Sequence, residues 1–145
     1  MASTIVSSED VWELTAEEDR SGGHASMVIP AKDYINAMRI RVKIQKAMDE
    51  LLSRYDAIVT PTLSTVAYPN DRPWREYHRG FSNTNIGGAG NAAGLPAVCV
   101  PNGFGEKHLP TGLQFVGRAF DENRLIAVAD AYQSRTDWHT KHPAV

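Results

Sequence analysis

The strongest hydrophobic pattern in the chain is helical and runs from Lys32 to Tyr55. Apolar side chains recur three or four positions apart, charged residues occupy the other faces, and neither glycine nor proline interrupts the run. Pro30 comes just before it, a common position near a helix start. The pattern therefore predicts a long amphipathic helix. Its apolar positions are Tyr34, Met38, Ile44, Met48, Leu51, Leu52 and Tyr55.

Three short apolar runs further along the chain predict strands. Residues 57–60 are closed by Pro61, residues 96–101 are bracketed by prolines, and residues 112–117 follow a polar tip. If the connection at 102–111 is a hairpin, the last two strands are antiparallel. Residues 62–80 are punctuated by proline, asparagine and glycine and are expected to form a long loop.

Two further segments complete the predicted layout. Residues 83–94 are rich in glycine and alanine, which allow close backbone approach or a tightly packed short helix. Asp121 is expected to cap a last helix in which Leu125, Val128, Ala129 and Tyr132 share a face. Trp138 is expected to pack the tail onto the body. The layout predicts one α/β domain over residues 31–145, preceded by an acidic, partly flexible arm over residues 1–30.

Composition and charge narrow the class of protein. The chain is 42% apolar and 22% charged with a net charge of −2, and its basic residues are scattered. We therefore expect a globular protein that binds neither nucleic acid nor membrane. The acidic start is unlike a signal peptide, and the lone Cys99 suits a reducing compartment, so a cytoplasmic location is expected. Cys99 lies in an apolar strand and is expected to be a buried, inert thiol.

Motifs for cofactor or metal chemistry are absent from the sequence. It contains no G-x-S-x-G elbow, no Walker loop and no H-E-x-x-H, and its glycines lack the spacing of a dinucleotide fingerprint. His139 and His142 are not accompanied by cysteine or a carboxylate cluster, which favours a solvated tail over a metal site. We expect no cofactor and no metal.

Read in order, several segments resemble the amidase-signature family. The similarity covers about residues 32–143, and the order and spacing of its pieces are specific. The pieces are Tyr-Asp-Ala-Ile-Val-Thr-Pro-Thr at 55–62, Asn-Ala-Ala-Gly-Leu-Pro-Ala-Val-Cys-Val-Pro-Asn-Gly at 91–103, Leu-Pro-Thr-Gly-Leu-Gln-Phe-Val-Gly at 109–117 and the helix from Asp121.

The resemblance implies a fold and a chemistry. The family hydrolyses amides, and sometimes esters or carbamates, and includes the subunit that releases ammonia from glutamine for tRNA-dependent amidation. Its fold is a layered α/β/α domain, of which this chain is expected to supply a fragment: a mixed sheet of three to four strands flanked by two main helices. The family nucleophile is a serine in a glycine- and serine-rich signature, activated through a second serine by a lysine.

None of these catalytic elements has a counterpart in this sequence. It contains no Gly-Gly-Ser-Ser-Gly-Gly-Ser run and no lysine in a matching position. The matched region instead implies a wall of the substrate pocket. Read without the family, the same positions also suit structural roles, at a strand exit or as an anchoring amide. The substrate-binding positions implied by the resemblance are Thr60, Pro61, Thr62, Asn91 and Gly94.

Three hypotheses about function remain open. The chain is a C-terminal amidase portion without catalysis of its own, a stand-alone small serine esterase or amidase with a new site, or an assembly module that completes a partner chain. In the second, Ser82 or Ser64 is the candidate nucleophile with His78 as base, and a small amide or ester is the substrate. All three predict a homo-oligomer or a partner subunit, because uncovered strand edges recruit other chains.

Overall fold

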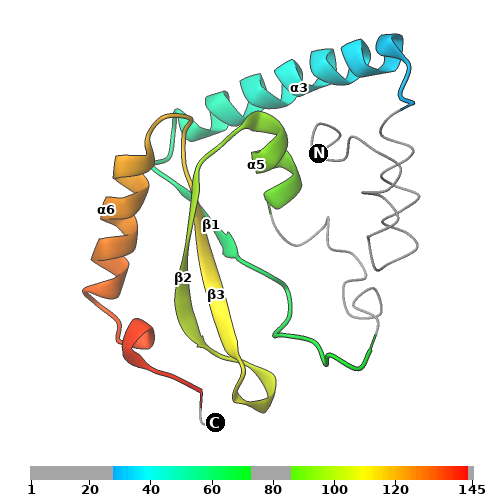
Figure 1. The fold of residues 1–145 in the computed structure, drawn as a ribbon. Coiled ribbons are helices and arrows are strands. Elements are labelled where there is room, and N and C mark those ends of the chain that lie inside the picture. Colours follow the sequence, from blue (N-terminus) through cyan, green and yellow to red (C-terminus); the bar gives the residue numbers. More distant parts are fainter. Residues whose placement is uncertain (1–27, 73–85, 144–145) are drawn as a thin grey trace. The chain divides into compact units, whose positions relative to one another are not determined.

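The computed structural model describes residues 28–72 and 86–143 of the chain. The chain divides into two compact units, Met1–Ile40 and Arg41–Val145. The predicted α/β class is confirmed, with helices and a small sheet alternating along the sequence (Figure 1). Apart from the first part of helix α3, the described helices and strands lie within the second unit.

Helix α3 spans Ala31–Leu52 and confirms the long helix predicted from periodicity. It begins after Pro30, whose carbonyl accepts the backbone N–H groups of Asp33 at 2.9 Å and Tyr34 at 3.1 Å. The buried part of the helix is narrower than the apolar pattern suggests. Met48 and Leu52 are buried, whereas Tyr34, Met38 and Tyr55 are exposed.

The described sheet has three strands in the order β1-β3-β2. These are β1 (Ile58–Pro61), β2 (Ala97–Phe104) and β3 (Pro110–Val116), and both pairings are antiparallel, so the described strands do not form the mixed sheet that was expected. The expected hairpin between the last two strands is confirmed. The Asn102-Gly103 pair does not form its turn: β2 continues through it with a bulge between Pro101 and Gly103.

The prolines in these strands occupy positions that tolerate a missing N–H. Thr62 donates to the carbonyl of Gly112 at 2.8 Å, and Gly117 donates to that of Pro96 at 3.1 Å. Because inward and outward backbone groups alternate along antiparallel strands, Pro61 on β1 and Pro101 on β2 face away from β3. Each therefore costs the ladder no hydrogen bond.

One face of the sheet carries the hydrophobic core. Helix α6 (Glu122–Gln133) packs on it, and Leu125 and Ala129 lie against Val100 and Phe115. The Phe115 and Tyr132 rings meet edge to face with centroids 5.9 Å apart. A Cβ at Gly117 would lie 2.7 Å from Leu125, so the strand-to-helix connection needs a glycine there. The predicted inward positions of the last helix are confirmed.

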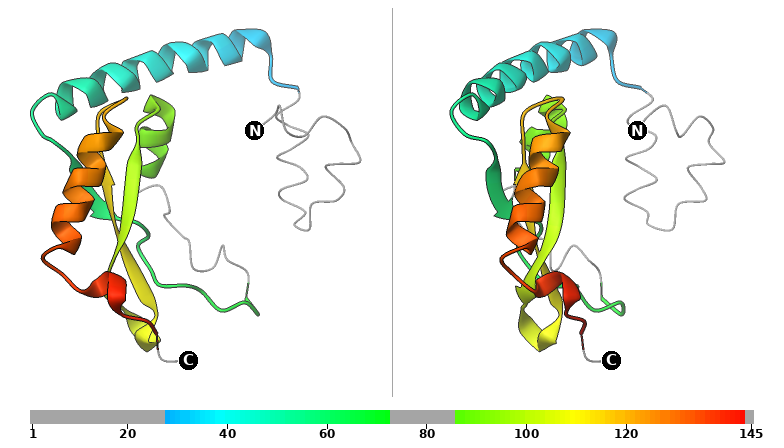
Figure 2. Two further views of the ribbon diagram at one scale, coloured as in Figure 1. Left: turned by 60° about the vertical axis from the view of Figure 1, so that its left-hand side comes forward. Right: turned by 90° about the vertical axis from the view of Figure 1, so that its left-hand side faces the viewer.

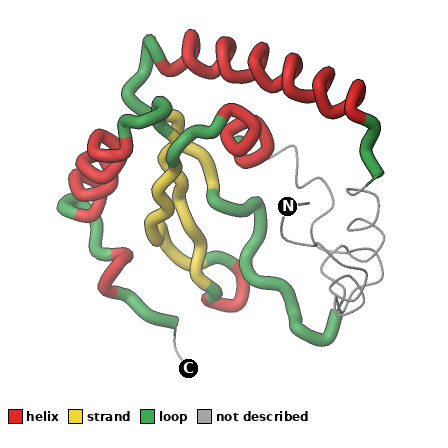
Figure 3. The backbone as a smooth tube through the Cα atoms, turned by 45° about the horizontal axis from the view of Figure 1, so that its top comes forward, coloured by secondary structure: helices red, strands yellow, loops and turns green. Residues whose placement is uncertain are grey.

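Helix α5 (Gly87–Ala93) packs on the opposite face. Gly90 is buried there, and a Cβ at this position would contact Val116 at 3.9 Å. Figures 1 and 3 show α6 on one side of the sheet and α5 on the other. Arg41 and Gln45 of α3 donate to the carbonyls of Ala92 and Ala93 at 2.7 and 3.3 Å, which ties the two helices together.

The tail folds back as expected for Trp138. The turn η2 (Trp138–Thr140) lies beside the hairpin end that carries the turn η1 (Glu106–His108), as both views of Figure 2 show. The Trp138 and Phe104 rings meet edge to face at 6.5 Å, and Lys141 lies 4.2 Å from the Trp138 ring centroid.

Two expectations about single residues are wrong. Asp121 precedes α6, but its side chain forms no capping hydrogen bond; it instead forms an ion pair with Arg124 one turn on, at 2.8 Å. Cys99 is exposed rather than buried. It shares a sheet face with Ala97, as alternation predicts, but α5 covers only the part of that face around Val116.

Candidate functional site

The exit of β1 places two threonines on the sheet face opposite α6. Thr60 pairs in register with Gln114, which pairs with Cys99 on the far strand, so these three side chains form a row across the sheet. The Thr60 hydroxyl is buried and has no hydrogen-bond partner among the described residues. A buried hydroxyl without a partner is unfavourable by roughly 1–3 kcal/mol, so this row is a candidate contact for a ligand or another segment.

The next row is shaped by a glycine. A Cβ at Gly112 would lie 2.7 Å from the Thr62 hydroxyl oxygen, so the threonine occupies the space above the glycine. Pro61, between the two threonines, points to the other face of the sheet and is exposed. Of the three predicted residues at this strand exit, the two threonines therefore share a face, and the proline does not.

Asn91 and Gly94 lie on or just after α5, on the same side of the sheet as the threonines. Asn91 is exposed. Gly94 ends the helix in a left-handed conformation with φ of 75°, and Leu95 donates to the Gly90 carbonyl at 3.0 Å in a Schellman-type cap. Gly94 therefore has a clear structural role at this helix end.

The serine and histidine candidates are only partly within the described structure. Ser82 and His78 lie outside the described residues. Ser64 is exposed in the loop after β1 and lines a cavity of about 430 Å³ between this loop and the hairpin tip. That cavity also contains Glu106 and Thr111 in its wall, and no described histidine lines it.

A second cavity continues this groove. It has a volume of about 490 Å³ and shares Thr65, Val66 and Glu106 with the first. The loop approaches the hairpin closely because Gly105 has no side chain: a Cβ there would lie 2.6 Å from Val66. The groove is a candidate binding surface that sequence reasoning missed, because it depends on contacts between segments about 40 residues apart.

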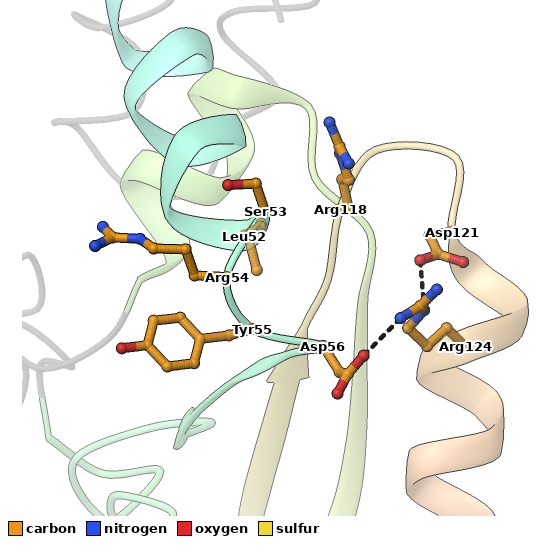
Figure 4. Close-up of a pocket in the computed structure, with 8 residues that line it drawn as sticks. All are labelled: Leu52, Ser53, Arg54, Tyr55, Asp56, Arg118, Asp121 and Arg124. Carbon is orange, nitrogen blue, oxygen red and sulfur yellow. Dashed lines mark hydrogen bonds and ion pairs between the residues drawn. The ribbon is translucent and has the colours of Figure 1, made fainter.

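A smaller, polar cavity of about 210 Å³ lies where α3 ends and α6 begins. Arg124 contacts both Asp56 and Asp121, and Arg118 contacts Asp49 at 2.8 Å (Figure 4). The hydrogen bond from Asp56, followed by the charge of Asp121, raises the pKa of Arg124 above its usual value. In Figure 4, Arg54 points away from these ion pairs. The arginines do not converge on one point, so the cluster joins elements and does not form an anion site.

Signals for a metal or a membrane are not found in the part of the chain that the structure describes. No group of three or more histidine, cysteine, aspartate or glutamate residues within 28–72 and 86–143 could hold a metal ion. No described helix is long and apolar enough to cross a membrane.

Comparison with known proteins identifies the family. The chain matches the Amidase family over residues 11–126, so it belongs to that family. It is 43% identical over 115 residues to the A subunit of glutamyl-tRNA(Gln) amidotransferase from Chloroflexus aggregans, and 36% identical over 110 residues to that from Legionella pneumophila strain Corby. These matches cover 76% of this chain in each case, but only 22% and 23% of the relatives.

Solved structures agree with this assignment. The crystal structure of the same amidotransferase component from Thermotoga maritima matches with a TM-score of 0.58 at 28% identity, over 94% of this chain and 32% of that one. The crystal structure of PAM12A matches with a TM-score of 0.62 at 29% identity, over 94% and 27%. The resemblance seen in the sequence is confirmed: the chain is homologous to these amidotransferase proteins and spans about a fifth to a third of their length.

Proposed function

We propose that this chain forms a substrate-facing wall of an amide hydrolase and does not catalyse hydrolysis by itself. The observation that carries the proposal is the row of Thr60, Gln114 and Cys99, in which the Thr60 hydroxyl is buried without a described partner. A hydroxyl and an amide on one open sheet face can orient a substrate amide or the loop that carries the nucleophile.

The absence of catalysis follows from the requirements of a serine nucleophile. A serine hydroxyl is weak unless a neighbouring base removes its proton and an oxyanion site stabilises the intermediate. The sequence lacks the family's serine-rich signature, and Ser64 lines its cavity without a described histidine. The nucleophile and its base must then come from protein outside these 145 residues.

The names of the relatives suggest the setting for this wall. As one subunit of a glutamyl-tRNA(Gln) amidotransferase, each belongs by its name to a multi-subunit enzyme. We infer that this chain works with partner polypeptide that supplies the signature, and that the amide hydrolysed is a small one such as glutamine.

A direct assay tests the catalytic part of the proposal. The purified chain is incubated with glutamine and with a short-chain nitrophenyl ester, and ammonia and nitrophenol are measured. Turnover at the blank rate is expected for the wild type, for Ser64→Ala and for Ser82→Ala. Turnover that disappears in either serine variant, with an unchanged circular dichroism spectrum, would establish a stand-alone hydrolase instead.

A chimera tests the wall itself. The matching segment of the Thermotoga maritima protein is replaced by this chain, and ammonia release from glutamine is measured. Retained activity is expected, with Thr60→Val lowering it about tenfold or more because one oriented hydroxyl is lost. Val59→Thr on the opposite face serves as the matched control. Equal activity in both variants would remove Thr60 from the site.

A further inference from the structure

The outer edge of β2 has unpaired backbone groups. Pro96 accepts a hydrogen bond from Gly117 at the end of β3, and by alternation Val98 and Val100 also face that strand, so the backbone groups of Ala97, Cys99 and Pro101 point outward. No described backbone group pairs with this edge. Two N–H donors and three carbonyl acceptors are therefore available along the five residues 97–101.

The side chains of this edge do not prevent pairing. Exposed edge strands are usually protected by charge, especially lysine, or by being very short. β2 has eight residues and none is charged. Ala97, Cys99 and Pro101 are all exposed, and the first two are small enough to allow another strand to approach.

The other edge of the sheet is less suitable. β1 has four residues, and only Val59 and Pro61 point outward, so a single N–H donor is available there. β1 also begins two residues after Asp56, which is paired with Arg124. The two edges therefore differ in donors, length and nearby charge.

We propose that β2 is a dimerisation strand, along which two copies of this chain pair antiparallel between Ala97 and Pro101. With Cys99 opposite Cys99 of the second copy, each Cys99 N–H donates to the other Cys99 carbonyl. Each Ala97 N–H then donates to a Pro101 carbonyl, so all outward donors are satisfied although Pro101 has none. No charged residue of either strand faces a like charge across the pair, and the two three-stranded sheets become one continuous sheet.

Sedimentation velocity of the whole chain from about 1 to 100 µM tests the proposal. A species of twice the 16.0 kDa chain mass is expected. Cys99→Lys places two like charges across the pair and is expected to weaken dimerisation at least about tenfold, or 1.4 kcal/mol. Val59→Lys introduces the same charge on the other edge and is the matched control, which stays dimeric.

A second variant guards against a change in folding. Ala97→Pro removes an outward N–H at the first residue of the strand and leaves the ladder to β3 intact, so it is expected to dissociate the dimer with an unchanged circular dichroism spectrum. A wild-type monomer at about 100 µM overturns the proposal. A dimer that survives both β2 variants, or that Val59→Lys dissociates, places the interface elsewhere and also overturns it.

Discussion

At the scale of single residues, glycines show most clearly how this sequence fits its fold. Gly94 has a positive φ that an alanine adopts only with strain, whereas Gly88 lies inside α5, where an added Cβ would meet nothing within 4 Å. Gly117 allows Leu125 to approach the strand end. The same substitution therefore has opposite consequences at neighbouring positions.

Gly94→Ala is expected to lower the free energy of unfolding by about 1 kcal/mol, since a left-handed backbone is unfavourable for a residue with a Cβ. Gly88→Ala should raise it by about 0.5–1 kcal/mol, because alanine favours the helix over glycine. Urea unfolding followed by circular dichroism measures both. Similar changes in the two variants would contradict the described end of α5.

The exposure of Cys99 gives a prediction about its chemistry. The thiol should react with Ellman's reagent in the folded protein at a rate within about tenfold of that in urea, because an exposed thiol is open to attack. The measurement is made at a concentration well below that of any self-association. A thiol that reacts only after unfolding would show that this face is covered in solution.

At the scale of elements, exposed ion pairs join segments that are distant in sequence. Arg118 contacts Asp49, and Arg124 contacts Asp56, which links the end of α3 to the start of α6. In the tail, Lys141 contacts Asp137 at 3.0 Å and also lies over Trp138. Such pairs contribute little individually and are sensitive to salt, so they fix the positions of elements more than they determine stability.

The Asp137 pair predicts how the tail responds to acid. The hydrogen bond from Lys141 lowers the pKa of Asp137, so its stabilising effect is present above the unfolded pKa near 4 and is lost as pH falls through the lower folded value. Trp138 fluorescence is expected to change below about pH 4 in the wild type. In Asp137→Asn this transition should be absent, with Asp130→Asn as the control that retains it.

The elements were far easier to predict from sequence than the site. Long apolar periodicity determines α3 and α6, and bracketing prolines mark the strands. The burial of Cys99 was predicted wrongly because alternation identifies a face but not what covers it. Asp121 was expected to cap a helix, yet a nearby arginine competes for its carboxylate. The groove beside Ser64 could not be predicted, because it exists only where a loop meets a distant hairpin.

At the scale of the whole molecule, the sheet has one central strand. β3 pairs on both sides, while β1 and β2 each have an open edge within the described residues. The core between this sheet and α6 uses only a few large side chains. Cooperative stability is therefore expected to be concentrated around β3 and α6.

Hydrogen exchange followed by mass spectrometry tests this distribution. Amides of β3 and the middle of α6 should exchange most slowly, with protection at least about tenfold greater than in β1, whose pairing is on one side only. Uniform protection across the three strands would indicate that the open edges are covered in solution.

The prolines of this sheet also act as a check on strand alignment. If β1 or β2 slipped by one residue against β3, Pro61 or Pro101 would turn inward, and a ladder position would have no donor. The same slip would move every apolar side chain to the wrong face. Misaligned pairings are thus penalised twice, so the correct alignment can be selected early in folding, before the distant parts of an amidase contribute any contact.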